Sequence, residues 1–146
     1  MAKLGIVYDG GWMSTLTQFF TGSRAYHVFW QTDEYVYDMY LLRRRRPGNT
    51  YKNQKIKYFD FPGVTQSYLE DRLTYDRSTY GFLDYLLFAL RPIYHLVGRS
   101  TRNMDGQICS EMCNVDLIAC GYATPWWNKS EVPSPADFDR WLITNK

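Results

Sequence analysis

The sequence contains few of the residues that build disulfides and metal sites. It has three cysteines and two histidines in 146 residues, and all the cysteines fall within 109–120. An odd number of cysteines without an export signal is not typical of a disulfide framework. Zinc sites usually take two close ligand pairs, and here only Cys109 and Cys113 form such a pair. We therefore expect no disulfide, no bound metal and no cofactor.

Long apolar runs, strong net charge and low-complexity tracts are also missing. No stretch approaches the roughly 20 apolar residues of a transmembrane helix, and the apolar run near the N-terminus is too short for a secretory signal. The formal net charge is +2, which is too small to indicate a nucleic-acid-binding protein. These absences predict no membrane span and no nucleic-acid partner, and a location in the cytoplasm or in association with a phage.

Aromatic and apolar residues are abundant, at 18% and 45% of the chain. This composition favours a single domain over 1–146 that contains a sheet, because aromatic side chains fit a pleated, half-buried surface. Alternating apolar residues predict strands, and apolar residues three or four apart predict helices. The fold class is therefore α+β. The predicted strands cover 3–9, 25–31, 35–42 and 55–62, and the predicted helices cover 12–20, 65–75, 80–97, 108–122 and 134–142.

Four consecutive arginines, Arg43, Arg44, Arg45 and Arg46, are unusual in a chain of balanced charge. They cannot all face one way on a strand or a helix. One interpretation is a solvated turn that ends at Pro47-Gly48. The other is a contact for phosphates, acidic sugars or an anionic membrane face.

The three cysteines differ in their positions. Cys113 and Cys120 lie seven apart inside the helix predicted over 108–122, and free cysteines are among the most buried residues, so we expect both in the core. Cys109 follows a loop and opens this helix. The backbone N–H groups and the dipole at a helix N-terminus favour the thiolate, which is the reactive form. Cys109 is therefore the candidate nucleophile.

A cysteine nucleophile needs an imidazole within reach and a polar group that orients the imidazole. His27 lies in the strand predicted over 25–31, where a lone histidine is usually a core residue. Asp38 lies in the next strand, and a hairpin turn around 32–34 brings the two side chains to one face of the sheet. His27 is therefore the candidate base and Asp38 the candidate orienting residue, whereas His95 has no matching acid.

These residues stand within an ordered set of short motifs. The chain resembles the circularly permuted papain-like amidases and cysteine peptidases in "SRAYHVFW", then "EYVYDMY", then "ICSEMC". This family is the YiiX and YaeF branch of the NlpC-type superfamily, which is related by fold to lecithin:retinol acyltransferase. The similarity extends over most of the chain through "GIVYD", "WMSTLTQFFTGS", "TYGFLDYLLFAL" and "PSPADFDRW".

The resemblance implies a fold and a set of roles. The fold would be a mainly antiparallel sheet packed against a buried helix that carries the nucleophile. Cys109 would be the nucleophile, His27 the base and Asp38 the orienting residue. This chain departs from the family in two places, since Asp38 is often glutamate there and Tyr26 replaces a small residue. The candidates for contacting the substrate or the oxyanion are Gln107, Ser110 and Tyr26.

The implied activity is that of a cysteine hydrolase, an amidase or thiol protease that needs no metal. The sulfur attacks a carbonyl, an acyl thioester forms, and water resolves it. The expected substrate contains a peptide, a peptidoglycan peptide, or an isopeptide or acyl bond, and the protein would be bacterial or phage-encoded. One alternative is a catalytically silent interaction domain of the same fold that blocks a host factor, which burial of Cys109 would favour. Another is a nucleic-acid-binding protein that uses the arginine run.

Overall fold

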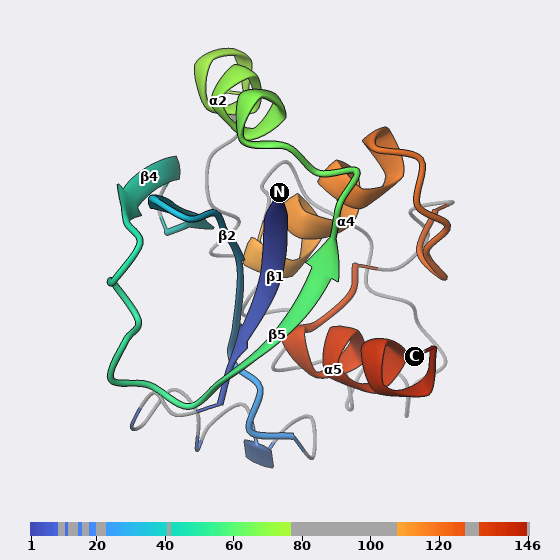
Figure 1. Cartoon of the computed structure of the whole chain (residues 1–146). Coiled ribbons are helices and arrows are strands. Elements are labelled where there is room, and N and C mark those ends of the chain that lie inside the picture. The colour runs from blue at the N-terminus through green and yellow to red at the C-terminus, as the bar shows by residue number, and fades with distance from the viewer. Residues whose placement is uncertain are drawn as a thin grey trace.

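The chain has an α+β fold in the computed structural model (Figure 1). The structure describes residues 1–8, 11, 15, 18–19, 23–40, 42–76, 108–127 and 132–145. Within these ranges, a five-stranded sheet is accompanied by three helices, which confirms the expected class. The strands are β1 (Ala2–Val7), β2 (His27–Gln31), β3 (Tyr35–Met39), β4 (Arg43–Pro47) and β5 (Ile56–Phe61), and the helices are α2 (Gln66–Tyr75), α4 (Cys109–Ala119) and α5 (Pro135–Thr144).

Neighbouring strands of the sheet are antiparallel throughout, in the order β4-β3-β2-β1-β5. β2 and β3 form the expected hairpin, in which Trp30 lies opposite Tyr37. Thr32 closes the turn, because its backbone N–H donates to the Tyr35 carbonyl at 2.8 Å. The expectation of one mainly antiparallel sheet is therefore confirmed for the part of the chain that the structure describes.

The two faces of the sheet bury different side chains, because successive side chains of a strand point to opposite faces. We call one the helix face: it carries Val28 and Trp30 and packs against α4 in the main core. α4 passes behind β1 in the view of Figure 1. The other face of the sheet, which we call the tyrosine face, carries a smaller cluster of buried side chains. The small cluster consists of Val7, Phe29 and Val36, with Tyr26, Tyr51 and Ile56 packed against it.

Local signals explain where the helices begin and end. The Thr65 side chain caps the N-terminus of α2. Ser134 and Asp137 form a capping box at the start of α5, and Pro135 occupies the first helical position. Gly121 takes a left-handed φ of 84° just after α4, a conformation that suits glycine and ends the helix. The start of the helix predicted over 134–142 is confirmed, with Ser134 as its N-cap.

The four-arginine run is strand β4, so the expectation of a solvated turn is wrong. β4 pairs with β3 at the edge of the sheet. Alternation directs Arg43 and Arg45 to the helix face and Arg44 and Arg46 to the tyrosine face. Carboxylates lie on both faces of the sheet here, and the ion pairs that they form with the arginines favour an extended strand over a turn. Arg43 pairs with Asp116, Arg44 and Arg46 pair with Asp38, and Arg45 pairs with Glu70.

A buried carboxylate joins α4 to the sheet. Asp116 of α4 is fully buried and accepts two hydrogen bonds from the Arg43 guanidinium, each 3.0 Å long. Trp30 Nε1 of β2 donates to the same carboxylate at 3.0 Å, and the Tyr68 hydroxyl of α2 donates at 3.1 Å. Burial raises the pKa of Asp116, and Arg43 partly offsets this. One carboxylate therefore fixes α4 relative to β2, β4 and α2.

Two expected helices fall largely outside the described residues. Of the segment 12–20, only residues 15, 18 and 19 are described, and the segment 80–97, which contains His95, lies wholly outside. Among the helices that the structure does describe, none is long and apolar enough to cross a membrane.

Substituting Arg43 tests the role of the buried pair. Arg43→Leu leaves the Asp116 carboxylate buried without its main partner, so we expect the free energy of unfolding to fall by about 3–5 kcal/mol. Arg45→Leu is the matched control, because Arg45 lies two residues along the same strand in an exposed pair with Glu70, and we expect it to change stability little. Urea unfolding of both variants measures the difference. Equal losses in the two variants would contradict this account.

Candidate active site

His27 and Asp38 come together as expected. His27 begins β2 and Asp38 lies in β3, and both point to the tyrosine face. Nε2 of His27 lies 3.9 Å from Oδ2 of Asp38, whose side chain is fully buried. This separation exceeds a hydrogen bond, and Nε2 has no hydrogen-bond partner among the described residues. The hairpin register explains the gap, since its continuation places Asp38 across from Phe29 and diagonal to His27.

Three other side chains hold Asp38. Arg44 donates from Nε to Oδ1 at 2.5 Å and from Nη2 to Oδ2 at 3.2 Å. The Tyr51 hydroxyl donates to Oδ2 at 2.6 Å, and Nη1 of Arg46 lies 3.5 Å from the same oxygen. Burial by itself raises the pKa of Asp38, but hydrogen bonds from Arg44 and Tyr51 outweigh it and leave the pKa below its ordinary value. Asp38 is therefore an ionised carboxylate at neutral pH.

The His27 imidazole is set among aromatic rings and is mostly buried, with 15% of its side chain exposed. Burial lowers the pKa of His27 to about 4, with Asp38 raising it and Arg44 and Arg46 lowering it. The ring is therefore uncharged at neutral pH and can accept a proton. Its ring neighbours are Phe29, Tyr51 and Tyr26, at centroid distances of 6.3, 5.6 and 6.3 Å.

Cys109 is the first residue of α4, as predicted, but it is buried. The residue is 6% exposed and belongs to the main core of the helix face. Burial raises the pKa of the Cys109 thiol to about 11, although backbone hydrogen bonding from Val28 and Ser110 lowers it. The expectation of a stabilised thiolate is therefore wrong, because desolvation outweighs the effect of the helix N-terminus.

The thiol approaches the sheet from the side opposite to His27 and Asp38. The resemblance implies that the helix of the nucleophile packs against the sheet, and α4 does so, but on the side of Val28 and Trp30 instead of the face that carries His27. The three groups nevertheless meet at one short stretch of the sheet, because Val28, whose backbone contacts the thiol, directly follows His27. The structure thus brings His27 and Asp38 together, whereas the Cys109 thiol lies in the core on the other side of the sheet, against the backbone of Val28, and makes no hydrogen bond to the imidazole.

The remaining site candidates have different outcomes. The Ser110 hydroxyl is fully buried and donates to the Pro133 carbonyl at 2.6 Å, so it anchors the start of α4 instead of facing a substrate. Tyr26 is half-buried beside His27, and its hydroxyl donates to Oε1 of Gln54 at 2.8 Å. A contact from Tyr26 to a substrate stays a prediction. Gln107 lies outside the described residues.

The other two cysteines follow the sequence analysis in part. Cys113 is fully buried, which confirms its assignment to the core. Cys120 is only partly buried and caps α4 at its C-terminus, so it packs at the margin of the core instead of inside the helix. Cys109 is more deeply buried than Cys120.

Sequence reasoning missed Tyr51 as a site residue. It lies in the connection between β4 and β5, where no periodic pattern points a side chain toward Asp38. The contribution of Arg44 and Arg46 was hidden by the assignment of the run to a turn. In the described part of the chain, no group of three or more histidine, cysteine or acidic residues is arranged to hold a metal ion.

Comparison with known proteins identifies no relative. No family model, no curated protein and no solved structure matches the chain.

The buried, neutral His27 predicts a loss of stability in mild acid. Unfolded His27 takes up a proton near its ordinary pKa of about 6.5, whereas folded His27 does so only near pH 4. As the pH falls from about 6.5 to 4, the unfolded state gains a proton that the folded state does not bind. We expect the free energy of unfolding to fall by about 3 kcal/mol over this range because of His27.

Urea unfolding at several pH values measures this effect, and His27→Gln is the control. The variant has no group at position 27 that titrates, so its stability should change less between pH 7 and pH 4. Parallel pH profiles for the two proteins would show that His27 is not held neutral by burial.

Proposed function

We propose that the protein is a cysteine hydrolase of the permuted papain-like type, an amidase or peptidase with Cys109 as nucleophile, His27 as base and Asp38 as orienting residue. The observation that carries the proposal is the pairing of His27 with an ionised Asp38 across 3.9 Å. This pair stands directly beside the backbone that contacts the thiol at the start of α4. A buried carboxylate next to an imidazole is the arrangement that orients a catalytic base.

The tautomer of His27 determines which nitrogen acts as the base. Asp38 faces Nε2, so its negative charge favours the tautomer that carries the hydrogen on Nε2. The lone pair is then on Nδ1, which becomes the acceptor for the Cys109 proton. Tyr51 and Arg44 keep the carboxylate ionised and fixed in place.

In the proposed reaction the thiol and the imidazole both start uncharged. The proton passes from Sγ of Cys109 to Nδ1 of His27 as the sulfur attacks a carbonyl carbon. The thiol approaches from the side of the sheet opposite the ring, so this step requires a rearrangement that brings Sγ within hydrogen-bond reach of Nδ1. Backbone N–H groups in the first turn of α4 stabilise the oxyanion. The imidazolium protonates the leaving group, and water hydrolyses the acyl thioester.

The substrate class follows from this chemistry. A nucleophilic sulfur with a histidine base acts on an amide, ester or thioester carbonyl, and peptides, peptidoglycan peptides and isopeptide- or acyl-linked groups all contain one. A cytoplasmic or phage-associated setting is part of the same proposal.

A second candidate is supported by the burial of Cys109. A core thiol with a pKa near 11 is what a catalytically silent interaction domain of this fold would have. In that case the His27–Asp38 pair would be a structural feature, and the protein would work by binding a partner such as a host factor. The two candidates differ in whether Cys109 ever forms an acyl adduct.

Acylation by a simple activated ester separates the candidates. We expect incubation with p-nitrophenyl acetate to place an acetyl group on Cys109, detected by mass spectrometry of proteolytic fragments. His27→Ala should slow this acylation at least about a hundredfold, because the thiol loses its base. Cys113→Ala should leave the rate nearly unchanged, although it removes a buried sulfur and should lower stability by about 1–2 kcal/mol.

Fragment mapping is essential because Cys120 is partly exposed and can react without catalysis. Acetylation of Cys120 alone, or equal rates in the wild type and His27→Ala, would remove the hydrolase proposal and leave the interaction domain.

A further inference from the structure

The two arginines of β4 that point to the tyrosine face share a single carboxylate. Arg44 and Arg46 both pair with Asp38, and the described groups around them include the uncharged His27 and the hydroxyl of Tyr51. Two positive charges therefore face one negative charge. The result is a local charge of +1 immediately beside the imidazole.

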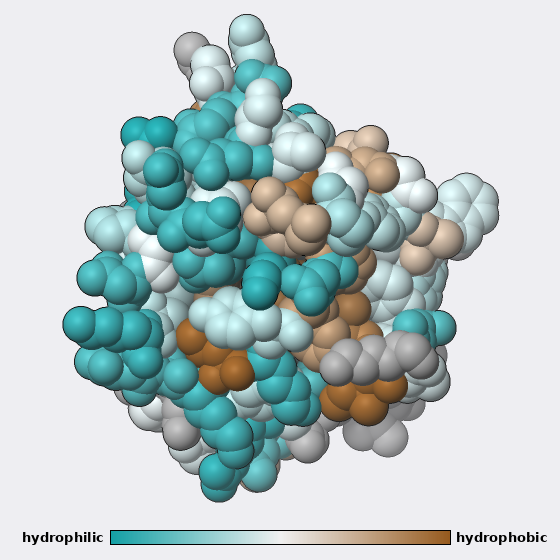
Figure 2. Space-filling view, viewed as in Figure 1, coloured by the Kyte–Doolittle hydropathy of each residue, from teal (hydrophilic) through white to brown (hydrophobic). Residues whose placement is uncertain are grey.

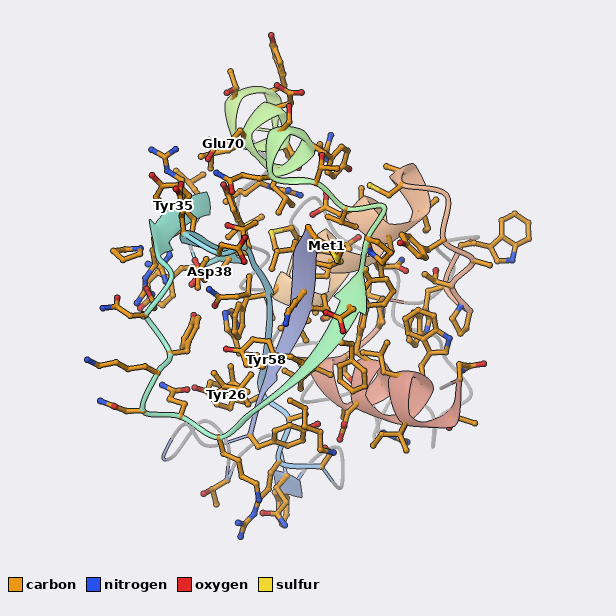
Figure 3. All side chains as sticks on the ribbon, viewed as in Figure 1. Met1, Tyr26, Tyr35, Asp38, Tyr58 and Glu70 are labelled. Carbon is orange, nitrogen blue, oxygen red and sulfur yellow. The ribbon has the colours of Figure 1, made fainter. Side chains whose placement is uncertain are left out.

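This excess positive charge reaches the surface. The side chains of Arg44 and Arg46 are 37% and 35% exposed, whereas the Asp38 side chain beneath them is fully buried. Arg44 and Arg46 belong to β4, which is an edge strand of the described sheet. Hydrophilic side chains cover the region of β4 and of the β4–β5 connection in Figure 2, and Figure 3 shows Asp38 beside β4.

Aromatic rings hold the two guanidiniums in place. Arg44 lies over the ring of Tyr40 at 4.7 Å, and Arg46 lies over the ring of Tyr51 at 5.5 Å. Stacking fixes the plane of a guanidinium while its N–H edge stays available. Arg46 uses only a long 3.5 Å contact from Nη1 to Asp38, so most of its donors are not committed to that carboxylate.

We infer that Arg44 and Arg46 form a subsite for a carboxylate group of the substrate, next to His27. A planar carboxylate matches the N–H edge of a guanidinium, and Asp38 already accepts from Arg44 through two oxygens in this way. A bound carboxylate cancels the local excess charge. The identity of this ligand as a substrate group rests on the proposed hydrolase function. In that reading, the enzyme prefers acyl donors with an acidic group near the scissile bond.

Acetate is a suitable probe because it supplies the carboxylate alone. The measurement follows the ring signals of His27 by NMR as sodium acetate replaces sodium chloride at constant ionic strength. We expect a saturable shift of these signals. We also expect acetate to raise the pKa of His27, because a nearby anion favours the imidazolium. Binding of acetate and binding of a proton to His27 then strengthen each other by the same factor.

Two variants localise the effect. Arg46→Gln should weaken acetate binding by about tenfold, because it removes one charged donor from the subsite. Arg45→Gln is the matched control, since Arg45 points to the helix face and pairs with Glu70, and it should bind acetate like the wild type. The amide dispersion of each variant verifies that it is folded, and Arg46→Met, which also removes the charge, replaces Arg46→Gln if the latter is not.

The results separate the subsite from the hydrolase proposal. Acetate binding in a protein whose Cys109 is never acylated would support the subsite but not the reaction. A shift that chloride reproduces, or an equal loss in the Arg45 and Arg46 variants, would overturn the subsite even if Cys109 is acylated.

Discussion

The rest of the structure depends on the hydrogen-bonded ion pair between Asp116 and Arg43. The carboxylate is buried in α4, and its partners come from β2, β4 and α2, so it determines where the helix lies against the sheet. Burying a charge is costly unless it is paired and hydrogen-bonded. A shift of α4 along β2 would break the hydrogen bonds that the buried Asp116 accepts from Arg43 and Trp30. The start of α4, and with it Cys109, is therefore held beside the first residues of β2.

The alternation of β4 connects this anchor to the candidate site. Arg43 and Arg45 stabilise the helix side, while Arg44 and Arg46 surround Asp38 on the tyrosine side. Four like charges in sequence are compatible with a strand only because carboxylates lie on both faces. One short edge strand thus positions the helix of the candidate nucleophile and fixes the partner of the candidate base.

Much of the fold could be predicted from the sequence because it depends on local signals. Alternation predicted four of the five described strands, and Ser134 marked a helix start through its capping chemistry. The pairing of His27 with Asp38 was predictable from a hairpin. The form of the arginine run was not, because its extended conformation depends on Asp38 in the neighbouring strand and on Glu70 and Asp116, which are far away in the sequence. The burial of Cys109 was also missed. A position at the start of a helix lowers the pKa of a thiol only where water or a nearby positive charge can solvate the thiolate.

His27 acts as the proposed base in its neutral form, with the hydrogen on Nε2 toward Asp38 and the lone pair on Nδ1. The ¹⁵N chemical shifts of the two ring nitrogens at pH 7 report the protonation state and the tautomer directly. The account predicts a protonated Nε2 and an unprotonated Nδ1. A ring with its hydrogen on Nδ1, or an imidazolium at this pH, would leave Nδ1 without a lone pair for the Cys109 proton and would contradict the proposed role of His27.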